Sequence, residues 1–279
     1  MILENTIKKA SQLLKNKNIY SHTLDAEIIL SDIMGVTREF LLTNQNIQIS
    51  QKTLDQYNKA IERRIKKEPV AYIIGKKEFW SQDFLVNSAT LIPRPETELL
   101  IYKVINFFKD KKINILDIGT GSGCILLSIL KELKNSRGTG IDISAKAVQI
   151  AITNSKKLNL FYRSKFKVFD INNFYMGRYD LIVSNPPYIS LSEMKNLSKS
   201  ITNYEPLVAL NGGSNGLDFI KKVIYKSNGL IKKNGLFALE IGNCQYLKVS
   251  SLLRQNGYRE MFKEFDYNQN VRCIISTKV

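Results

Sequence analysis

The 279-residue sequence predicts an α/β fold, in which a mostly parallel sheet with an antiparallel edge hairpin follows a small N-terminal helical bundle. Residues 1–74 carry apolar side chains at helical spacing and show no strand-like alternation. From residue 113 onward, short apolar runs alternate with helical segments, which is typical of a parallel sheet covered on both faces. The last two apolar runs have no helical segment between them, which predicts an antiparallel pair.

The N-terminal segment is expected to form several helices. Apolar side chains recur at helical spacing within residues 7–14, 24–33 and 53–67. Thr37 and Ser50 each precede a helical segment, and their hydroxyl groups suit the N-cap position of a helix. We therefore expect a small helical bundle in this part of the chain.

The pattern changes at about residue 75, where strand-like residues begin. Residues 78–86 place aromatic and β-branched side chains near period two, which indicates a short hairpin. Pro95 suits the first turn of a following helix. The predicted domains are a helical domain at residues 1–74, a hairpin linker at 75–92 and an α/β domain at 93–279.

The α/β domain is expected to contain seven strands. They are predicted at residues 113–118, 139–143, 165–169, 179–184, 236–241, 258–265 and 272–277. Helices are predicted at residues 125–133 and 145–157. We interpret the connection between the fourth and fifth strands as short.

The chain is strongly basic, with a formal net charge of +16 from 41 Lys and Arg against 25 Asp and Glu. Such a charge attracts nucleic acids and ribonucleoprotein surfaces. The lysines, however, occur as scattered pairs, such as Lys8 with Lys9 and Lys232 with Lys233, and no arginine-rich helix stands out. We therefore do not expect direct binding of nucleic acid, and we expect a monomer.

Composition also limits the compartment and the chemistry. No apolar run reaches the roughly 18 residues that cross a bilayer, and the first residues lack the pattern of a secretory signal. Cys124, Cys244 and Cys273 lie far apart without metal-ligand spacing, and His22 is the only histidine. We expect a cytoplasmic protein with no membrane contact and no metal site, whose chemistry does not use imidazole.

A glycine-rich segment, DIGTGSG at residues 117–123, lies where the first predicted strand of the sheet meets its helix. Glycines allow a tight turn and close approach of a ligand, and the helix N-terminus offers N–H donors. Alone, this pattern also fits a dinucleotide site or a simple tight turn. Asp142 and Asp170 follow the next two strands at the same sheet edge, where carboxylates can accept from ribose hydroxyls or an adenine amino group. Together these residues predict a bound nucleoside.

A second candidate site follows the fourth strand, in the sequence NPPY at residues 185–188. The two prolines stiffen the backbone, so the Pro186 carbonyl and the Asn185 side-chain oxygen can both accept from one –NH2 group. Tyr188 offers a flat face for a planar amide or base. Two acceptors orient the nitrogen and raise its electron density, which helps a poor amide nucleophile attack a sulfonium methyl group. The motif therefore predicts methylation of an amide or amino nitrogen without a strong general base.

These motifs resemble the HemK/PrmC family of peptide chain release factor glutamine methyltransferases. The linker sequence IPRPETE at residues 92–98 is the most specific part, supported by EFW at residues 78–80 and by Glu205 with Pro206. The resemblance covers nearly the whole chain. It implies a Rossmann-like class I methyltransferase domain that uses S-adenosyl-L-methionine, and an N-terminal domain that recognises the substrate. It further implies methylation of N5 of the glutamine in the Gly-Gly-Gln motif of class 1 peptide chain release factors.

The resemblance also implies roles for individual residues. The expected cofactor-binding residues are Gly119, Thr120, Gly121, Ser122, Gly123, Asp142, Asp170, Ile171 and Asn185. The expected glutamine-binding residues are Asn185, Pro186, Pro187 and Tyr188, with Asn185, Pro186 and Tyr188 as the catalytic ones. The family often carries an aromatic residue just after the acid that ends the third strand, and here Ile171 stands at that position.

Three alternatives belong beside this hypothesis. An adenine-N6 methyltransferase of nucleic acid must flip a base and usually carries a sizeable recognition region, which neither the small helical domain nor a short fourth-to-fifth connection provides. Methylation of a glutamine in a ribosomal protein is closer in kind and stays open. A binding module without activity would show a broken glycine segment or a degenerate NPPY, and both are intact.

Overall fold

The computed structural model of the chain describes residues 2–279, which form two compact units. The first, here called the helical unit, comprises the described part of Met1–Lys76 together with Ser198–Tyr204. The second, here called the sheet unit, comprises Lys77–Leu197 and Glu205–Val279.

The helical unit packs around one apolar core. Its helices are α1 (Leu3–Lys15), α2 (His22–Met34), α3 (Arg38–Thr43), α4 (Gln51–Ile65), α5 (Val70–Ile74) and α10 (Lys199–Thr202). The side chains of Thr37 and Ser50 accept from the N–H groups of Phe40 and Thr53 at 3.2 and 3.1 Å, so both predicted caps are confirmed. Helix α5 was not predicted, because its five residues are too few to show a helical period.

Polar groups buried within the helical unit are paired. Tyr57 is 1% exposed, and its hydroxyl donates to the carbonyl of Ala26 at 3.0 Å. The guanidinium of Arg64 pairs with the carboxylate of Asp25 at 2.7 Å. Both interactions join α4 to α2, and a buried pair of this kind specifies one packing arrangement because an unpaired partner would be costly.

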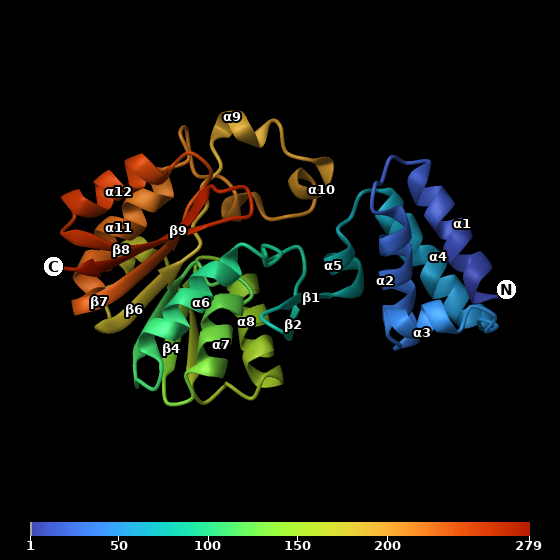
Figure 1. The fold of residues 1–279 in the computed structure, drawn as a ribbon, viewed down its shortest axis with the longest axis horizontal. Coiled ribbons are helices and arrows are strands. Elements are labelled where there is room, and N and C mark those ends of the chain that lie inside the picture. The colour runs from blue at the N-terminus through green and yellow to red at the C-terminus, as the bar shows by residue number, and fades with distance from the viewer. Residues whose placement is uncertain (1) are drawn as a thin grey trace. The chain divides into compact units, whose positions relative to one another are not determined.

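The sheet unit contains a seven-stranded sheet with the order β5-β4-β3-β6-β7-β9-β8 (Figure 1). Its strands are β3 (Asn114–Ile118), β4 (Arg137–Asp142), β5 (Ser164–Val168), β6 (Tyr179–Ser184), β7 (Ile231–Glu240), β8 (Tyr258–Phe265) and β9 (Val271–Lys278). Strands β3 to β7 pair in parallel, whereas β9 is antiparallel to both β7 and β8. The predicted mostly parallel sheet with an antiparallel edge hairpin is therefore confirmed. The predicted linker hairpin forms a separate pair, β1 (Lys76–Phe79) and β2 (Gln82–Leu85).

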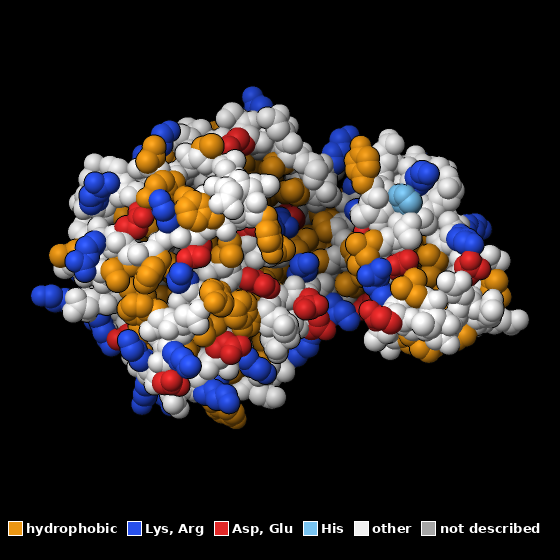
Figure 2. All heavy atoms as spheres, viewed as in Figure 1, with side chains coloured by type: hydrophobic (Ala, Val, Ile, Leu, Met, Phe, Trp, Pro, Cys, Tyr) orange, Lys and Arg blue, Asp and Glu red, His pale blue; other side chains and the backbone are white. Residues whose placement is uncertain are grey.

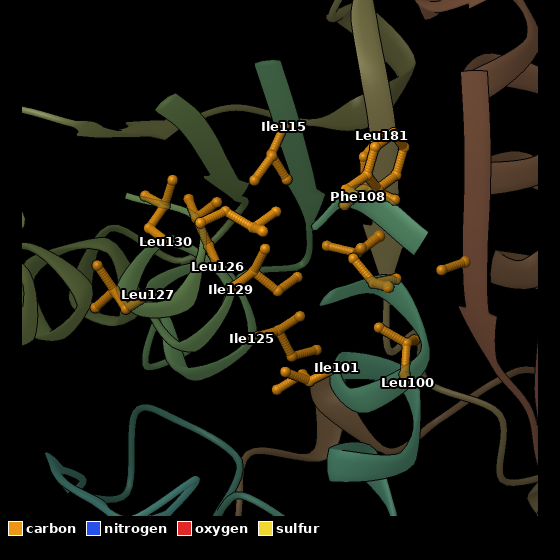
Figure 3. Packing of buried hydrophobic residues seen from close by; sticks show 14 of the residues in the cluster. Leu100, Ile101, Phe108, Ile115, Ile125, Leu126, Leu127, Ile129, Leu130 and Leu181 are labelled. Carbon is orange, nitrogen blue, oxygen red and sulfur yellow. The ribbon is translucent and has the colours of Figure 1, made fainter. Parts of the chain in front are cut away.

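Helices cover both faces of this sheet. Successive residues of a strand point to opposite faces, so neighbouring residues belong to different core clusters. Ile115 and Leu181 join one core cluster with residues of α6 and α7 (Figure 3), whereas their neighbours Leu116 and Ile182 join another with residues of α11 and α12. The helices of the unit are α6 (Thr97–Phe108), α7 (Cys124–Glu132), α8 (Ala145–Lys157), α9 (Leu191–Met194), α11 (Asp218–Leu230) and α12 (Tyr246–Gln255), with 3-10 turns η1 (Ile171–Asn173) and η2 (Leu207–Ala209). Burial of both faces explains the apolar runs of the central strands β3, β6 and β7, whereas the outer strands β5 and β8 carry exposed polar residues.

The strand order places a switch point between β3 and β6. The chain continues from β3 to β4 and β5 on one side, and from β6 to β7 on the other. In open α/β sheets, ligands bind at the carboxyl ends of the strands at such a point. The residues that follow β3 and β6 are the glycine-rich segment and Asn185.

Two predictions about this unit were wrong. Helix α6 begins at Thr97 rather than Pro95, because residues 94–97 form a tight turn in which the Thr97 N–H donates to the Arg94 carbonyl at 3.1 Å. The connection between β6 and β7, residues 185–230, is long rather than short and contains α9, α10, η2 and α11. Helix α9 and turn η2 bury no residues, so they leave no apolar period in the sequence.

Helix α11 buries Ile220, Val223 and Ile224 at helical spacing and was predictable on that ground. The length of this connection removes one of the two reasons given against a nucleic-acid substrate. Within residues 2–279, no helix combines the length and apolar character that crossing a membrane requires.

Candidate active site

The glycine-rich segment forms the turn between β3 and α7. Gly119, Gly121 and Gly123 have φ values of 74°, 55° and 80°, a region that favours glycine. The N–H groups of Gly119 and Thr120 donate to the carbonyl of Ile141 at 2.9 and 3.0 Å, which ties the turn to β4. No atom lies within 4 Å of a Cβ built on Gly119 or Gly121. The turn is therefore anchored on one side and open to a ligand on the other.

Asp142, the last residue of β4, is held by backbone donors. One carboxylate oxygen accepts from the N–H of Gly121 at 2.9 Å, and the other accepts from the N–H of Ser144 at 2.9 Å. Burial raises the pKa of Asp142, and these two N–H groups act in the opposite direction. A carboxylate has about four acceptor positions, so the backbone leaves some free. The side chain is thus fixed in place while it can still accept from a diol.

The third strand ends in a mainly apolar wall. Asp170 accepts from the N–H of Asn172 at 2.8 Å and so caps the turn η1, while Ile171 is 3% exposed. Phe169 and Ile143 line the same cavity as these two residues. Sequence reasoning missed both apolar side chains. Here the aromatic residue, Phe169, comes directly before Asp170 instead of after it. Its position at the end of a predicted strand could have identified it.

One cavity of about 380 Å³ brings most of the predicted site residues together. The predicted residues in its wall are Gly119, Thr120, Gly121, Ser122, Asp142, Asp170, Ile171, Asn185 and Pro187. Gly123, Pro186 and Tyr188 are not among the lining residues. Gly123 instead occupies the N-cap of α7, and the Tyr188 hydroxyl points to Glu240.

The linker also contributes to the cavity wall, through Arg94 and Thr97. The Arg94 guanidinium pairs with the carboxylate of Glu205 at 2.7 Å, and the other oxygen of Glu205 accepts from the N–H of Ile92 at 3.2 Å. Residues 206–209, directly after Glu205, line the cavity as well. Two motifs noted separately in the sequence, IPRPETE and Glu205 with Pro206, therefore bind each other. Their separation along the chain left no local signal of this contact.

Asn185 belongs to a chain of hydrogen bonds that ends at the buried carboxylate of Glu240. Its Nδ2 donates to Oγ1 of Thr97 at 3.2 Å, and Thr97 Oγ1 donates to Oε2 of Glu240 at 2.6 Å. The Tyr188 hydroxyl donates to the other oxygen of Glu240 at 3.2 Å. Burial raises the pKa of Glu240, while the Thr97 hydroxyl and the nearby Arg272 guanidinium oppose that shift. The amide of Asn185 is therefore oriented by groups outside its own segment.

A glutamine side chain supports the backbone of the NPPY turn. Nε2 of Gln245 donates to the carbonyls of Tyr188 and Gly216 at 2.9 and 3.2 Å, and its Oε1 accepts from the N–H of Gly242 at 2.8 Å. A Cβ on Gly216 would collide with the Tyr188 carbonyl, and its φ of 74° also favours glycine. Gln245 and Gly216 are functional supports that the sequence motifs did not reveal.

Two aspartates near the glycine turn, Asp117 and Asp142, bear on the fit of the site to S-adenosyl-L-methionine. Below the glycine turn, Oδ2 of Asp117 accepts from the Thr120 hydroxyl at 2.6 Å. Its Oδ1 is buried and has no hydrogen-bond partner among residues 2–279, and burial raises the pKa of Asp117 to about 7. Buried polar atoms are normally paired. Asp117 is not part of the cavity wall, whereas the carboxylate of Asp142 and the apolar wall are, and these two fit a ligand that carries hydroxyl donors beside a base, as S-adenosyl-L-methionine does.

Other reactive side chains are placed elsewhere or are unreactive. Within residues 2–279, no three His, Cys, Asp or Glu side chains gather in a metal-binding arrangement. Nδ1 of His22 lies 2.8 Å from the Ser11 hydroxyl in the helical unit. Cys124 lines the cavity, and burial raises the pKa of its thiol to about 12, so it stays protonated at neutral pH.

Comparison with known proteins identifies relatives along the whole chain. A family model described as the PrmC N-terminal domain matches residues 5–75, and one described as a methyltransferase domain matches residues 109–273. The sequence is 35% identical to the release factor glutamine methyltransferase of Clostridium acetobutylicum, over 100% of this chain and 99% of that protein. It is 36% identical to the protein of the same name from Buchnera aphidicola subsp. Baizongia pistaciae, over 100% of both. A solved methyltransferase from Pyrococcus furiosus shares the fold, with a TM-score of 0.53 and 18% identity over 78% of this chain and 96% of that one.

Proposed function

Because the chain belongs to the release factor glutamine methyltransferase family, we propose that it methylates N5 of the glutamine in the Gly-Gly-Gln motif of class 1 peptide chain release factors. It is an S-adenosyl-L-methionine-dependent methyltransferase. The observation that carries the proposal is that Asn185 lines the same cavity as the glycine turn and Asp142. A methyl donor and an –NH2 acceptor can therefore be held next to each other.

We assign cofactor binding to the residues of the glycine turn and of the following strand ends. The bound cofactor supplies an electrophilic methyl group on a sulfonium sulfur. Asp142 accepts from the ribose hydroxyls, and Ile143, Phe169 and Ile171 provide an apolar surface for the adenine ring. Open glycine backbone in the turn allows close approach.

We assign substrate binding to the NPPY turn. Oδ1 of Asn185 and the carbonyl of Pro186 accept from the two hydrogens of the glutamine –NH2 group, and Pro187 and Tyr188 form the sides of the slot. Both acceptors draw electron density toward the nitrogen and orient its lone pair. Positioning of this kind accounts for a large part of the rate in a direct displacement.

The reaction balances without a strong base. The nitrogen lone pair forms the N–C bond, and the C–S bond breaks with its electron pair left on sulfur, which removes the positive charge from sulfur. The alkylated nitrogen carries that charge until it loses one proton to solvent. The products are N5-methylglutamine, S-adenosylhomocysteine and a proton.

We also propose the division of labour between the domains: residues 1–74 recognise the substrate, residues 75–92 are a linker and residues 93–279 carry out the transfer. Two separate family models, over residues 5–75 and 109–273, support this division. The helical unit also has its own apolar core. A recognition module that folds around its own core can present a surface to a protein partner independently of the chemistry.

We propose that the protein acts in the cytoplasm as a monomer and does not bind nucleic acid directly. Figure 2 shows Lys and Arg side chains dispersed over the visible face, with Asp and Glu side chains between them. A nucleic-acid-binding face would gather its basic side chains into one patch or stripe. The visible face carries no such patch, so on this face the net charge of +16 favours encounter with acidic surfaces in general.

A labelling experiment separates this proposal from its alternatives. The purified protein is incubated with methyl-labelled S-adenosyl-L-methionine and a class 1 release factor, either intact or with the Gly-Gly-Gln glutamine changed to alanine. We expect label in the intact factor and none in the altered one. Equal labelling of the intact and the altered release factor, or label that appears only with RNA, DNA or ribosomal protein, would overturn the proposal.

A further inference from the structure

Three side chains from distant parts of the chain form a directed series of hydrogen bonds. Glu240 ends β7, Thr97 begins α6 and Asn185 follows β6. Asn185 Nδ2 donates to Thr97 Oγ1 at 3.2 Å, and Thr97 Oγ1 donates to Glu240 Oε2 at 2.6 Å. Thr97 and Glu240 are 2% and 0% exposed, so water does not substitute for either partner.

The direction of the series follows from the number of hydrogens available. Glu240 accepts from the hydroxyl of Thr97 through Oε2 and from the hydroxyl of Tyr188 through Oε1. Thr97 has one hydroxyl hydrogen and gives it to Glu240. Thr97 can therefore only accept from Asn185, which turns Nδ2 of Asn185 toward Thr97 and Oδ1 away from it. The opposite amide orientation would place two acceptors against a single hydrogen.

We propose that Thr97 and Glu240 are positioning residues that hold the Asn185 amide with Oδ1 toward the substrate, an inference that rests on the proposed glutamine methylation. Neither residue needs to touch the reacting atoms. Their effect is to make Asn185 an acceptor only on its substrate side. That choice suits the –NH2 group of glutamine and opposes the carboxylate of glutamate, which has no hydrogen to donate.

The alternative, a purely structural role, does not explain the burial of a carboxylate here. The last six residues of β7 are all buried, and an apolar side chain at position 240 would suit such a strand better than a charge. Buried polar groups that break this rule are expected at functional sites. The Glu240 carboxylate is connected through the Thr97 hydroxyl to the amide of Asn185, which lines the cavity.

The test compares Thr97→Val, which keeps the shape and removes the hydroxyl, with Thr97→Ser, which keeps the hydroxyl. Thr277→Val is the control, because Thr277, on strand β9, is likewise a buried threonine. Its hydroxyl donates to the carbonyl of Gly235, and neither residue lines the cavity. Wild-type turnover on the release factor is measured in the same assay, so loss of the proposed function itself would show as an inactive wild type.

For Thr97→Val we expect kcat to fall about 10²-fold, the usual scale for losing one oriented polar contact in a transition state. Affinity for S-adenosylhomocysteine should stay within about threefold, and Thr97→Ser and Thr277→Val should keep most of the activity. A wild-type kcat in Thr97→Val, or an equal loss in Thr97→Ser, would overturn the inference. If Thr97→Val does not fold, Thr97→Ala replaces it with the same expectations.

A second readout reports the orientation of the amide itself. A release factor carrying glutamate in place of the Gly-Gly-Gln glutamine is used as a competitive inhibitor. Wild type should bind it more weakly than the glutamine form, and Thr97→Val should narrow this preference because a reversed Asn185 amide donates to the carboxylate. An unchanged preference in a folded Thr97→Val would contradict the inference, since a structural defect alone would weaken both ligands alike.

The role of Glu240 is tested by a double-mutant cycle. Glu240→Leu removes the acceptor that holds the Thr97 hydroxyl, so we expect a loss of kcat similar to that of Thr97→Val. Because both residues act through the same amide, the kcat of the double variant should be no lower than that of the less active single variant. Losses that multiply would show two independent effects and would overturn the series.

Discussion

The two halves of the cavity are held in different ways. In the cofactor half, backbone groups do the holding: the glycine turn donates to Ile141, and Asp142 accepts from backbone N–H groups on both oxygens. In the acceptor half, side chains hold the site. Asn185 bonds to Thr97, 88 residues away along the chain, and Thr97 bonds to Glu240, a further contact across 143 residues. A backbone anchor survives most nearby substitutions, whereas a side-chain series fails when one member is changed. Cofactor binding and turnover should therefore be separable by mutation.

Asn185→Ala should give the largest separation. Loss of the oriented acceptor should lower kcat by about 10³-fold while cofactor affinity, measured by calorimetry with S-adenosylhomocysteine, changes little. Asn196→Ala, at an exposed asparagine, is the control and should match wild type. If Asn185→Ala instead abolished cofactor binding and spared the chemistry, the division between the two halves would be wrong.

Asp142→Ala should show the reverse pattern. The dissociation constant for the cofactor should rise about 10- to 100-fold, since hydrogen bonds to a charged group contribute about 1.5–3 kcal/mol. The value of kcat at saturating cofactor should stay close to wild type, because the NPPY turn is untouched. Titration and steady-state kinetics measure the two quantities, and a lower kcat at an unchanged dissociation constant would count against the assignment.

Gly123→Ala tests how strictly the turn depends on backbone conformation. Gly123 has a φ of 80°, and an added Cβ would lie 3.2 Å from side chains of Ala151, Leu127 and Phe166. We expect a loss of about 2 kcal/mol in the free energy of unfolding by urea. Gly229→Ala, in α11 with nothing within 4 Å of the added Cβ, should be neutral or slightly stabilising. Equal effects of the two substitutions would show that the turn is not strained.

Asp117→Asn tests the buried acceptor under the turn through pH. The folded-state pKa of Asp117 is raised to about 7, above its ordinary value of 3.8, so ionisation costs stability as pH rises between these values. Asparagine cannot ionise, so the variant should gain about 2–3 kcal/mol of stability relative to wild type between pH 5 and pH 8. Thermal unfolding of both proteins at the two pH values measures the gain. If the stability advantage of Asp117→Asn over wild type instead became smaller as pH rose, the pKa of Asp117 would not be raised in the folded state.

The same contrast decides what the sequence could predict. The glycine turn, Asp142 and Asp170 sit at strand ends, and each signal is local: three glycines in seven residues, or an acid after an apolar run. The parallel sheet, its edge hairpin and the caps at Thr37 and Ser50 were predictable for the same reason. Local patterns report local geometry well.

The supports of Asn185 were not predictable in this way. Thr97 was recognised only as part of a family-specific linker, and Glu240 reads as the polar end of an apolar strand. Their contact exists only because α6 and β7 pack together in the fold. The contact of Arg94 with Glu205 is of the same kind, and no spacing rule connects residues so far apart. Helix α11 differs, since its apolar period is present in the sequence and was overlooked.

Site-resolved mass spectrometry of the substrate tests the central claim most directly. A class 1 release factor is incubated with S-adenosyl-L-methionine and either wild type or Asn185→Ala, digested and sequenced by fragmentation. We expect one methyl group on the side chain of the Gly-Gly-Gln glutamine with wild type and almost none with Asn185→Ala. A methyl group on any other residue, or equal methylation by both proteins, would contradict it.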